Sequence, residues 1–396
     1  MSNETYQVDR RGANEHATPQ SDGAVGFSRC PSFEQDLTPD LTATVAEAFA
    51  KATPLMIKGS GSKAFYGRAT HGQVIDLSGH SGILEYEPAE LVLTARAGTP
   101  LKHIEHILAQ AGQMLPFEPP QFGDCQSIGG TIGGAVASGL SGPARPWQGA
   151  VRDSVLGVTL LSGEGKVLHF GGKVMKNVAG YDVSRLMAGA LGTLGILLEV
   201  SIRVLPLPRV QQTQLIPMTA TQALAHLAEW NRSPLPINGA SFHEGALHVR
   251  LAGAHSAVHK AALRIGGEPL EPNAATRYWQ ALRDHHLPFF QAKTGDLWRV
   301  ALPLTAPVDA LPPACQLIDW GGQQRWLWLD HPSDAAKIGT QAKAARGHAT
   351  LFCAATGNPE APFSPLPAPL LALQQRVKAA LDPKELFNRG RLYPEL

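Results

Sequence analysis

The sequence predicts an α+β protein of two parts, and three observations carry this prediction. Its 396 residues exceed what one hydrophobic core ordinarily holds. Three glycine-bearing segments, each next to an expected strand, occupy the first half of the chain (58–63, 131–142 and 180–195). From Val210 onward the glycine clusters stop, and expected strands alternate with amphipathic helices, a pattern typical of helices on an antiparallel sheet.

The composition argues against several classes of partner and cofactor. With a net charge of +1 at pH 7, the chain has no electrostatic reason to bind nucleic acid or a membrane surface. Its four cysteines (30, 125, 315 and 353) include no Cys-x-x-Cys pair, which argues against a zinc ribbon or an iron–sulfur cluster in this chain. His103 and His106 share a helix face without a third ligand nearby, so no metal site is expected.

The cysteine pattern also lacks the density of a secreted disulfide scaffold, which favours a reducing cytoplasm. Residues 1–23 are polar and contain no apolar core of a secretory signal. We therefore expect residues 1–36 to form a disordered leader.

In the first half, apolar periodicity predicts two helices, at 41–52 and 101–111. Thr38 and Thr99 are expected to cap them, with Pro39 and Pro100 in their first turns. Strands are expected at 55–57, 74–77, 91–96, 155–161, 166–170 and 196–204. The last of these alternates strictly, so Glu199, Ser201 and Arg203 are expected on a solvated face. Pro206 and Pro208 close this first part.

In the second half, helices are expected at 221–230, 255–265, 273–285 and 334–346. Strands are expected at 247–251, 297–302, 316–320, 325–329 and 350–353, with Gly321-Gly322 as a hairpin turn between two of them. Five prolines between 359 and 369 predict a stiff connector. A last helix at 370–381 and an apolar tail are expected to pack back onto the body.

Residues 126–143 carry six glycines, one threonine, three serines and no charge. Glycine lets a ligand approach the main chain, and successive free N–H groups in such turns bind anions, phosphates above all. So many glycines and hydroxyls make the stretch too weakly apolar for a membrane span. The segment 58–63 (Lys-Gly-Ser-Gly-Ser-Lys) is a second turn of this kind, although it matches neither the Walker nor the Rossmann pattern.

Taken together, these segments and the tail at 382–391 resemble the flavoprotein family that binds FAD in a domain of the vanillyl-alcohol oxidase or p-cresol methylhydroxylase type. The resemblance lies in residues 58–63, 131–134 with Gly139 and Gly142, 152–157, 180–196 and Asn388-x-Gly390-Arg391. Within that family, residues 37–393 are most similar to the FAD-binding E subunits of bacterial glycolate oxidases. The stretches 61–68, 135–146 and 174–195 carry this closer likeness.

The resemblance implies a domain for each part of the chain. Residues 37–208 would form a two-part FAD-binding domain of the p-cresol methylhydroxylase type. Residues 209–357 would form a smaller α+β FAD-linked oxidase domain on the substrate side, and 358–396 the connector, helix and tail that return to the FAD domain.

The resemblance also assigns cofactor-binding residues. Two nests of N–H groups, one in the first glycine loop and one in residues 132–142, would neutralise the pyrophosphate, so Gly133→Asp is predicted to abolish FAD binding. Asn388 would reach back towards the isoalloxazine. No histidine in the loops is placed for a covalent link, so FAD is expected to be non-covalent. The cofactor-binding residues are Gly59, Ser60, Gly61, Ser62, Lys63, Pro119, Thr131, Ile132, Gly133, Gly134, Ser138, Gly139, Gly142, Gly195, Ile196 and Asn388.

Catalytic residues are not assigned. Relatives that oxidise 2-hydroxy acids hold metal and substrate with paired histidines around a Gly-Asp-Gly turn, which this chain lacks; His243 and His248 are the nearest equivalent. Leu191 also stands where relatives often have a glutamate.

The implied function is that of an FAD-dependent oxidoreductase acting on the CH–OH group of 2-hydroxy acids, within a complex that oxidises glycolate to glyoxylate. Hydride abstraction from the α-carbon would occur mainly at the FAD of a sister catalytic subunit, and an iron–sulfur subunit would carry the electrons onward. The FAD of this chain would be a relay, a second active centre or a structural prosthetic group. The expected location is the cytoplasm, or the inner-membrane surface through the complex. Two alternatives stay open: a stand-alone FAD-dependent oxidase of another 2-hydroxy acid or an alcohol, and a non-catalytic assembly subunit.

Overall fold

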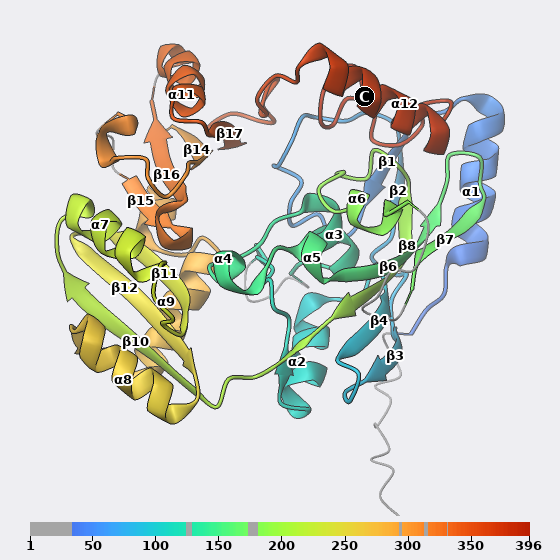
Figure 1. Cartoon of the computed structure of the whole chain (residues 1–396). Helices are drawn as coiled ribbons and strands as arrows, with labels where there is room; N and C mark the ends of the chain where they lie inside the picture. Colours follow the sequence, from blue (N-terminus) through green and yellow to red (C-terminus); the bar gives the residue numbers. More distant parts are fainter. Residues whose placement is uncertain (1–33, 124–128, 173–180, 293–294, 313–315, 331) are drawn as a thin grey trace, which may run out of the picture. The chain divides into compact units, whose positions relative to one another are not determined.

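An antiparallel five-stranded sheet organises the first part of the chain (Figure 1). The computed structural model describes residues 34–123, 129–172, 181–292, 295–312, 316–330 and 332–396. The sheet has the order β3-β4-β8-β6-β7. Its strands are β3 (Ile83–Glu87), β4 (Val92–Arg96), β6 (Val155–Leu161), β7 (Val167–Gly171) and β8 (Ile196–Arg203).

The central strand, β8, is covered on both faces. Its residues Leu197, Val200 and Ile202 belong to one apolar cluster, and Ile196 and Leu198 belong to another. The expectation of a solvated face is therefore wrong. Ser201 is buried with its hydroxyl 2.9 Å from that of Thr94, and Glu199 accepts a hydrogen bond from Thr159 at 2.7 Å.

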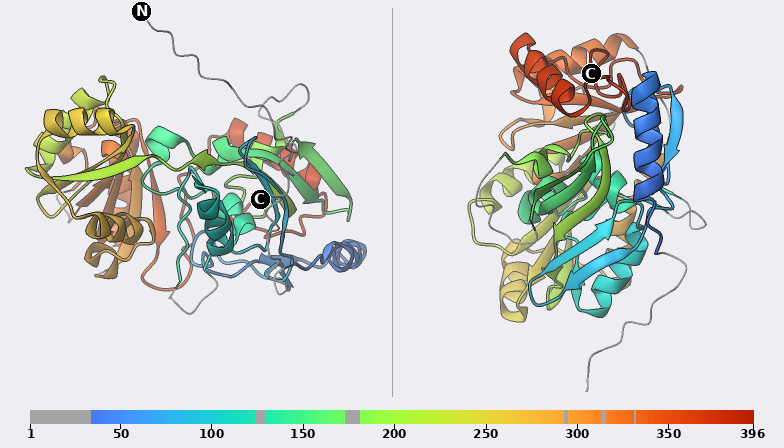
Figure 2. Two further views of the ribbon diagram at one scale, coloured as in Figure 1. Left: turned by 90° about the horizontal axis from the view of Figure 1, so that it is seen from below. Right: turned by 90° about the vertical axis from the view of Figure 1, so that its right-hand side faces the viewer.

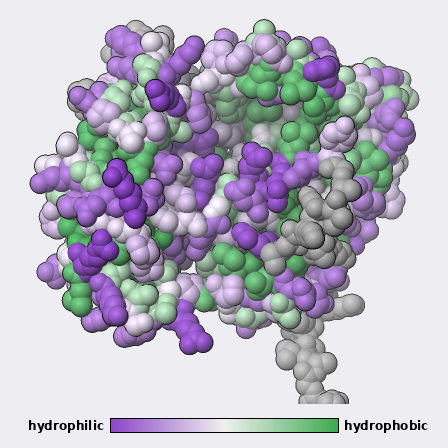
Figure 3. Space-filling view, viewed as in Figure 1, coloured by the Kyte–Doolittle hydropathy of each residue, from purple (hydrophilic) through white to green (hydrophobic). Residues whose placement is uncertain are grey.

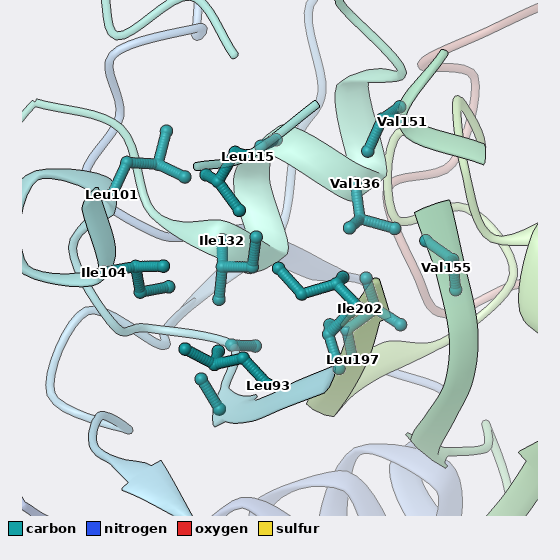
Figure 4. Close-up of a cluster of buried hydrophobic side chains, with 14 of the residues drawn as sticks. Leu93, Leu101, Ile104, Leu115, Ile132, Val136, Val151, Val155, Leu197 and Ile202 are labelled. Carbon is teal, nitrogen blue, oxygen red and sulfur yellow. The ribbon is translucent and has the colours of Figure 1, made fainter. Parts of the chain in front are cut away.

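Short helices cover one face of this sheet. They are α2 (Leu101–Gln110), α3 (Ile132–Ser138), α5 (Val151–Ser154) and α6 (Val183–Leu186). In Figure 4, Ile132 of α3 lies toward Leu101, Ile104 and Leu93. Val136 of the same helix lies toward Val151 and Val155. The predicted helix at 101–111 is thus present.

The other apolar cluster belongs to α1 (Thr38–Lys51) and the parallel pair β1 (Leu55–Lys58) and β2 (Gln73–Asp76). The predicted helix is present, but neither expected cap holds. The α1 N-cap is Leu37, and the α2 N-cap is Pro100; neither makes a side-chain cap. Thr99 instead donates to the Arg96 carbonyl at 2.7 Å and accepts from the Gly82 N–H at 2.9 Å.

An eight-stranded antiparallel sheet of order β13-β10-β12-β11-β15-β16-β14-β17 organises the second part. The chain enters it through β9 (Leu205–Pro206), which pairs with β5 (Gln113–Met114), and then through β10, drawn in yellow-green in Figure 2. The strands are β10 (Val210–Pro217), β11 (Ile237–His243), β12 (Ala246–Gly253), β13 (Glu268–Pro269), β14 (Asp296–Ala301), β15 (Gln316–Asp319), β16 (Gln324–Leu329) and β17 (His348–Cys353).

The helices of this part are α7 (Ala220–Trp230), α8 (His255–Ile265), α9 (Pro272–Arg283), α10 (Pro288–Gln291) and α11 (Pro332–Ala344), with α4 (Arg145–Gln148) earlier in the chain. Two 3-10 turns, η1 (Val308–Ala310) and η2 (Trp320–Gly322), complete the elements. Helices against an antiparallel sheet confirm the predicted α+β class, and η2 confirms the turn at Gly321-Gly322. Among the strands longer than two residues, β3, β10 and β11 were not predicted from the sequence.

Of the predicted leader at 1–36, residues 1–33 lie outside the described residues. Residues 34–36 belong to the folded part, because Gln35 exchanges two backbone hydrogen bonds with Ser81, at 2.9 and 3.1 Å. From residue 34 onward the described chain packs as one unit. Within it, no helix combines the length and apolar character needed to cross a bilayer.

The C-terminal segment packs against the first part. After α12 (Ala368–Leu381), Leu386 and Phe387 are buried beside Leu55. The ammonium of Lys378 is buried, and it donates to Asp382 at 2.8 Å and to the carbonyls of Thr193 at 2.6 Å and Phe387 at 3.0 Å. This network fixes the tail to the loop before β8.

Breaking that network should destabilise the whole chain. Lys378→Met leaves the Asp382 carboxylate buried without its cation, so the free energy of unfolding should fall by about 3–5 kcal/mol. Lys51→Met is the matched control, because it removes another i,i+4 lysine–carboxylate pair whose side chains are about two-thirds exposed. Urea unfolding should show a lower midpoint for Lys378→Met and an unchanged one for Lys51→Met. Equal midpoints would contradict this role.

Candidate functional site

Four segments of the chain converge on a cavity of about 220 Å³. It is bounded by the turn after β1, by α3, by the loop before β8 and by the tail. Eleven of the residues assigned from the sequence line it together: Gly59, Ser60, Gly61, Ser62, Lys63, Thr131, Gly133, Gly134, Ser138, Gly195 and Asn388. Segments more than 300 residues apart thus meet at one site.

The turn at residues 59–63 offers backbone donors to this cavity. Among the described residues, no acceptor is hydrogen bonded to any of its five N–H groups. Gly61 has φ +78°, a conformation that side chains rarely adopt, so glycine is required there. Unpaired N–H groups in such a turn are suited to an anionic ligand.

The charges around the cavity have the same sign. Its charged lining residues are Lys58, Lys63 and Arg391, and no carboxylate lines it in the described part of the chain. Burial lowers the pKa of Lys63 to about 8, while Asp284 acts to raise it. Lys63 therefore remains mostly protonated at neutral pH. The free donors and cations fit the diphosphate of a dinucleotide.

The second glycine segment does not form the predicted nest. Thr131 caps the N-terminus of α3, and Gly133 and Gly134 lie in its first turn. Their N–H groups are already paired, to the Ala97 carbonyl at 2.8 Å and to the Thr131 hydroxyl at 3.2 Å. The N–H groups of Ile132, Ala135, Gly139 and Gly142 are also paired with backbone carbonyls. Neither glycine of the first turn therefore has a free N–H to donate to a phosphate.

Gly133 is required for packing instead. A Cβ on Gly133 would lie 2.6 Å from the Ala97 Cβ and 2.8 Å from the Ala97 oxygen. The predicted loss of FAD in Gly133→Asp would therefore begin as a clash inside the protein. The reason given from the sequence, charge beside a phosphate, does not apply.

Five assigned residues lie outside the cavity lining. Ile132 and Ile196 are fully buried in the two apolar clusters. Pro119 is buried as well. Gly139 caps the end of α3 and packs against Gly189, and Gly142 packs against Glu118. Any role of these five would be indirect, through the main chain or through packing.

Asn388 joins two walls of the cavity. Its side-chain oxygen accepts from the Ile57 N–H at 2.9 Å, and its Nδ2 donates to the Leu191 carbonyl at 2.7 Å. A Cβ on Gly192 would lie 2.8 Å from that nitrogen. The amide is thus committed to the protein, with a positioning role that the sequence did not predict.

Arg391 was not assigned from the sequence, although it lines the cavity. Its Nη2 donates to the carbonyls of Tyr66 at 2.7 Å, Ala64 at 3.0 Å and Lys63 at 3.4 Å. It therefore holds the turn that lines the cavity. The available signal was its place in the tail motif, three residues after Asn388.

The structure does not bring His243 and His248 to this cavity. They lie on the β11–β12 hairpin, where the His248 ring stacks on Tyr278 with centroids 3.8 Å apart. Burial lowers the pKa of His248 to about 4, so this ring is neutral at physiological pH. In the described ranges, no three His, Cys, Asp or Glu side chains are grouped so as to hold a metal.

Comparison with known proteins supports this view of the cavity. Residues 37–171 match the family model of an FAD binding domain. The glycolate oxidase subunit GlcE of Escherichia coli is 48% identical over 363 residues, which cover 92% of this chain and 99% of that protein. The chain belongs to the GlcE family. Its cofactor is FAD.

More distant proteins share only part of this likeness. The glycolate oxidase subunit GlcD of Bacillus subtilis is 32% identical over 41% of this chain and 34% of its own length. An alkyldihydroxyacetonephosphate synthase structure superposes with a TM-score of 0.62 over 88% of this chain and 75% of that chain, at 14% identity. The predicted FAD-binding fold of the p-cresol methylhydroxylase type is thereby confirmed.

The tight contact at Gly133 predicts unequal effects of two adjacent alanine substitutions. Gly133→Ala should lower the free energy of unfolding by about 1–3 kcal/mol, because the methyl overpacks against Ala97. Gly134→Ala meets only the Thr131 hydroxyl at 3.2 Å and should change stability much less. Denaturant unfolding of both variants measures the difference. If Gly134→Ala were the more damaging, the packing of α3 would be misassigned.

Proposed function

We propose that this chain is the FAD-binding subunit of a complex that oxidises glycolate to glyoxylate. The observation that carries the proposal is the glycine-lined, cationic cavity in a chain that aligns with GlcE over nearly its whole length. Non-covalent FAD would be held by the free N–H groups of residues 59–63 together with Lys63. When bound, FAD would supply the redox chemistry, as a relay for electrons from the partner subunit or as a second hydride acceptor.

The protein's part is to build and shield the cofactor site. Arg391 and Asn388 fix its walls through hydrogen bonds to the main chain. Gly61 allows the turn at 59–63 to adopt a positive φ. Apolar side chains, among them Leu77, Ala97 and Leu197, line the same cavity and would exclude water from the bound group.

Partners are part of the proposal. The four cysteines lack the spacing of cluster ligands, so an iron–sulfur subunit would carry the electrons onward. The outer face of α12 supports a multi-subunit arrangement, since Leu370 and Leu373 are 41% and 47% exposed. In Figure 3, hydrophobic residues gather beside this helix. A GlcD-like subunit, with its own FAD, would be the main site of glycolate oxidation, and the complex would be cytoplasmic or attached to the inner membrane.

Co-expression tests this assignment. The chain purified alone should show the visible absorption of bound flavin, and glycolate should bleach it only after the partner subunits are added. Bleaching by glycolate without partners would favour a stand-alone oxidase. A chain that carries no flavin after gentle purification, even with its partners, would contradict the proposal.

Two tail arginines give a matched test of the cofactor site. Arg391→Gln should weaken FAD binding roughly ten- to hundredfold, because the charged donor that fixes residues 63–66 is lost. Arg389→Gln is the control: its side chain is exposed and pairs only with Glu385 among the described residues. Fluorescence titration of the apoprotein with FAD gives both dissociation constants. Equal constants would show that Arg391 does not organise this site.

A further inference from the structure

A second pocket, of about 250 Å³, adjoins the proposed cofactor cavity. The two share Ser138 and Leu191 as lining residues, so one wall separates them. The new pocket is also lined by Arg145 of α4, Arg152 of α5 and Tyr393 of the tail. Tyr66, which is buried, forms another side. The FAD assignment does not use these side chains.

No carboxylate lines this pocket in the described part of the chain. Arg145 and Arg152 line it, and Arg299 stands behind Tyr66, with Nη2 3.0 Å from the Tyr66 hydroxyl oxygen. Among the described residues, none of the three arginines forms an ion pair with a carboxylate. Asp153 is the nearby acid, and its carboxylate accepts a hydrogen bond from the Ala150 N–H at 2.9 Å.

Arg145 and Arg299 are held in place by aromatic rings, although neither forms an ion pair with a described carboxylate. The Arg145 guanidinium lies 4.4 Å from the centre of the Trp320 ring, and the Trp320 Nε1 donates to the Gly142 carbonyl at 3.0 Å. The Arg299 guanidinium lies 5.6 Å from the centre of the Phe352 ring. Partial desolvation of the guanidinium by the protein atoms around it, together with the charges of Arg299 and Arg152, lowers the pKa of Arg145. Clustered like charges fixed on aromatic rings favour binding of an anion.

Tyr66 provides a neutral hydrogen-bond donor, its hydroxyl, beside the charged guanidinium groups. Its hydroxyl oxygen accepts from Arg299, so its proton is free to be donated to a ligand. Tyr393 is already committed, because its hydroxyl donates to the Ser364 carbonyl at 3.1 Å. The pocket therefore offers guanidinium forks, which match a carboxylate in pairs of hydrogen bonds, and one hydroxyl donor.

We propose that Arg145 and Arg152, with Tyr66 oriented by Arg299, form a binding site for the carboxylate of a small organic acid beside the cofactor cavity. The volume fits a molecule of a few carbon atoms better than a polypeptide segment. The identity of the acid as glycolate rests on the proposed function; the carboxylate site itself rests on the pocket.

Calorimetric titration of the FAD-loaded chain tests the site with two ligands of similar size, glycolate and glycolamide, in which a charged carboxylate is replaced by a neutral amide. Glycolate should bind saturably, and glycolamide at least tenfold more weakly. Arg145→Gln and Arg152→Gln should each weaken glycolate binding roughly ten- to hundredfold. Both side chains are exposed, so these variants should fold. Arg376→Gln, on the exposed side of α12, is the control and should bind as the unmodified chain does.

Several results would overturn the proposal: no saturable binding of glycolate, equal binding of glycolamide, or an unchanged constant in Arg145→Gln. Inorganic sulfate that binds as tightly as glycolate would make the pocket a general oxyanion site. Tyr66→Phe should weaken glycolate binding while the visible flavin spectrum keeps its intensity. That intensity is recorded for every variant, so a failure of FAD binding is distinguished from a failure of the carboxylate site.

Discussion

Hydrogen bonds from the C-terminal segment hold the walls of the cofactor cavity in place. Asn388 joins the end of β1 to the loop at Leu191, and Arg391 fixes the carbonyls of residues 63–66. Lys378 secures the same loop through Thr193. Each of these bonds joins the tail to backbone carbonyl or N–H groups, so the cavity depends on chain geometry more than on particular side chains in its walls.

The two glycine segments, residues 59–63 and 131–142, therefore have different structural roles. In the first, glycine leaves N–H groups unpaired and permits a left-handed turn. In the second, glycine lets α3 approach Ala97 so closely that Ile132 can enter the core beneath it. One segment provides donors to a ligand, and the other brings the cavity floor against the sheet.

The sequence was most informative where a pattern is local. Periodic apolar residues located α2, α8 and α12, and the tail motif located Asn388. It was least informative where residues distant in the sequence determine the hydrogen bonds. The Gly133 N–H donates to the Ala97 carbonyl. The Thr99 hydroxyl bonds to Arg96 and Gly82 and does not cap its own helix. Strand β11 was missed because small and polar residues such as Asn238, Gly239 and Ser241 fill much of a buried strand and give no apolar signal.

The reach of the tail also has a consequence for the order of events during synthesis. Asn388 is separated from its partner Ile57 by 331 residues, which at 5–20 residues per second take about 17–66 s to be made. Throughout that interval the turn at 59–63 and the strand before it are without the groups that later fix them. The walls of the cavity can therefore reach their final arrangement only after the tail has been made.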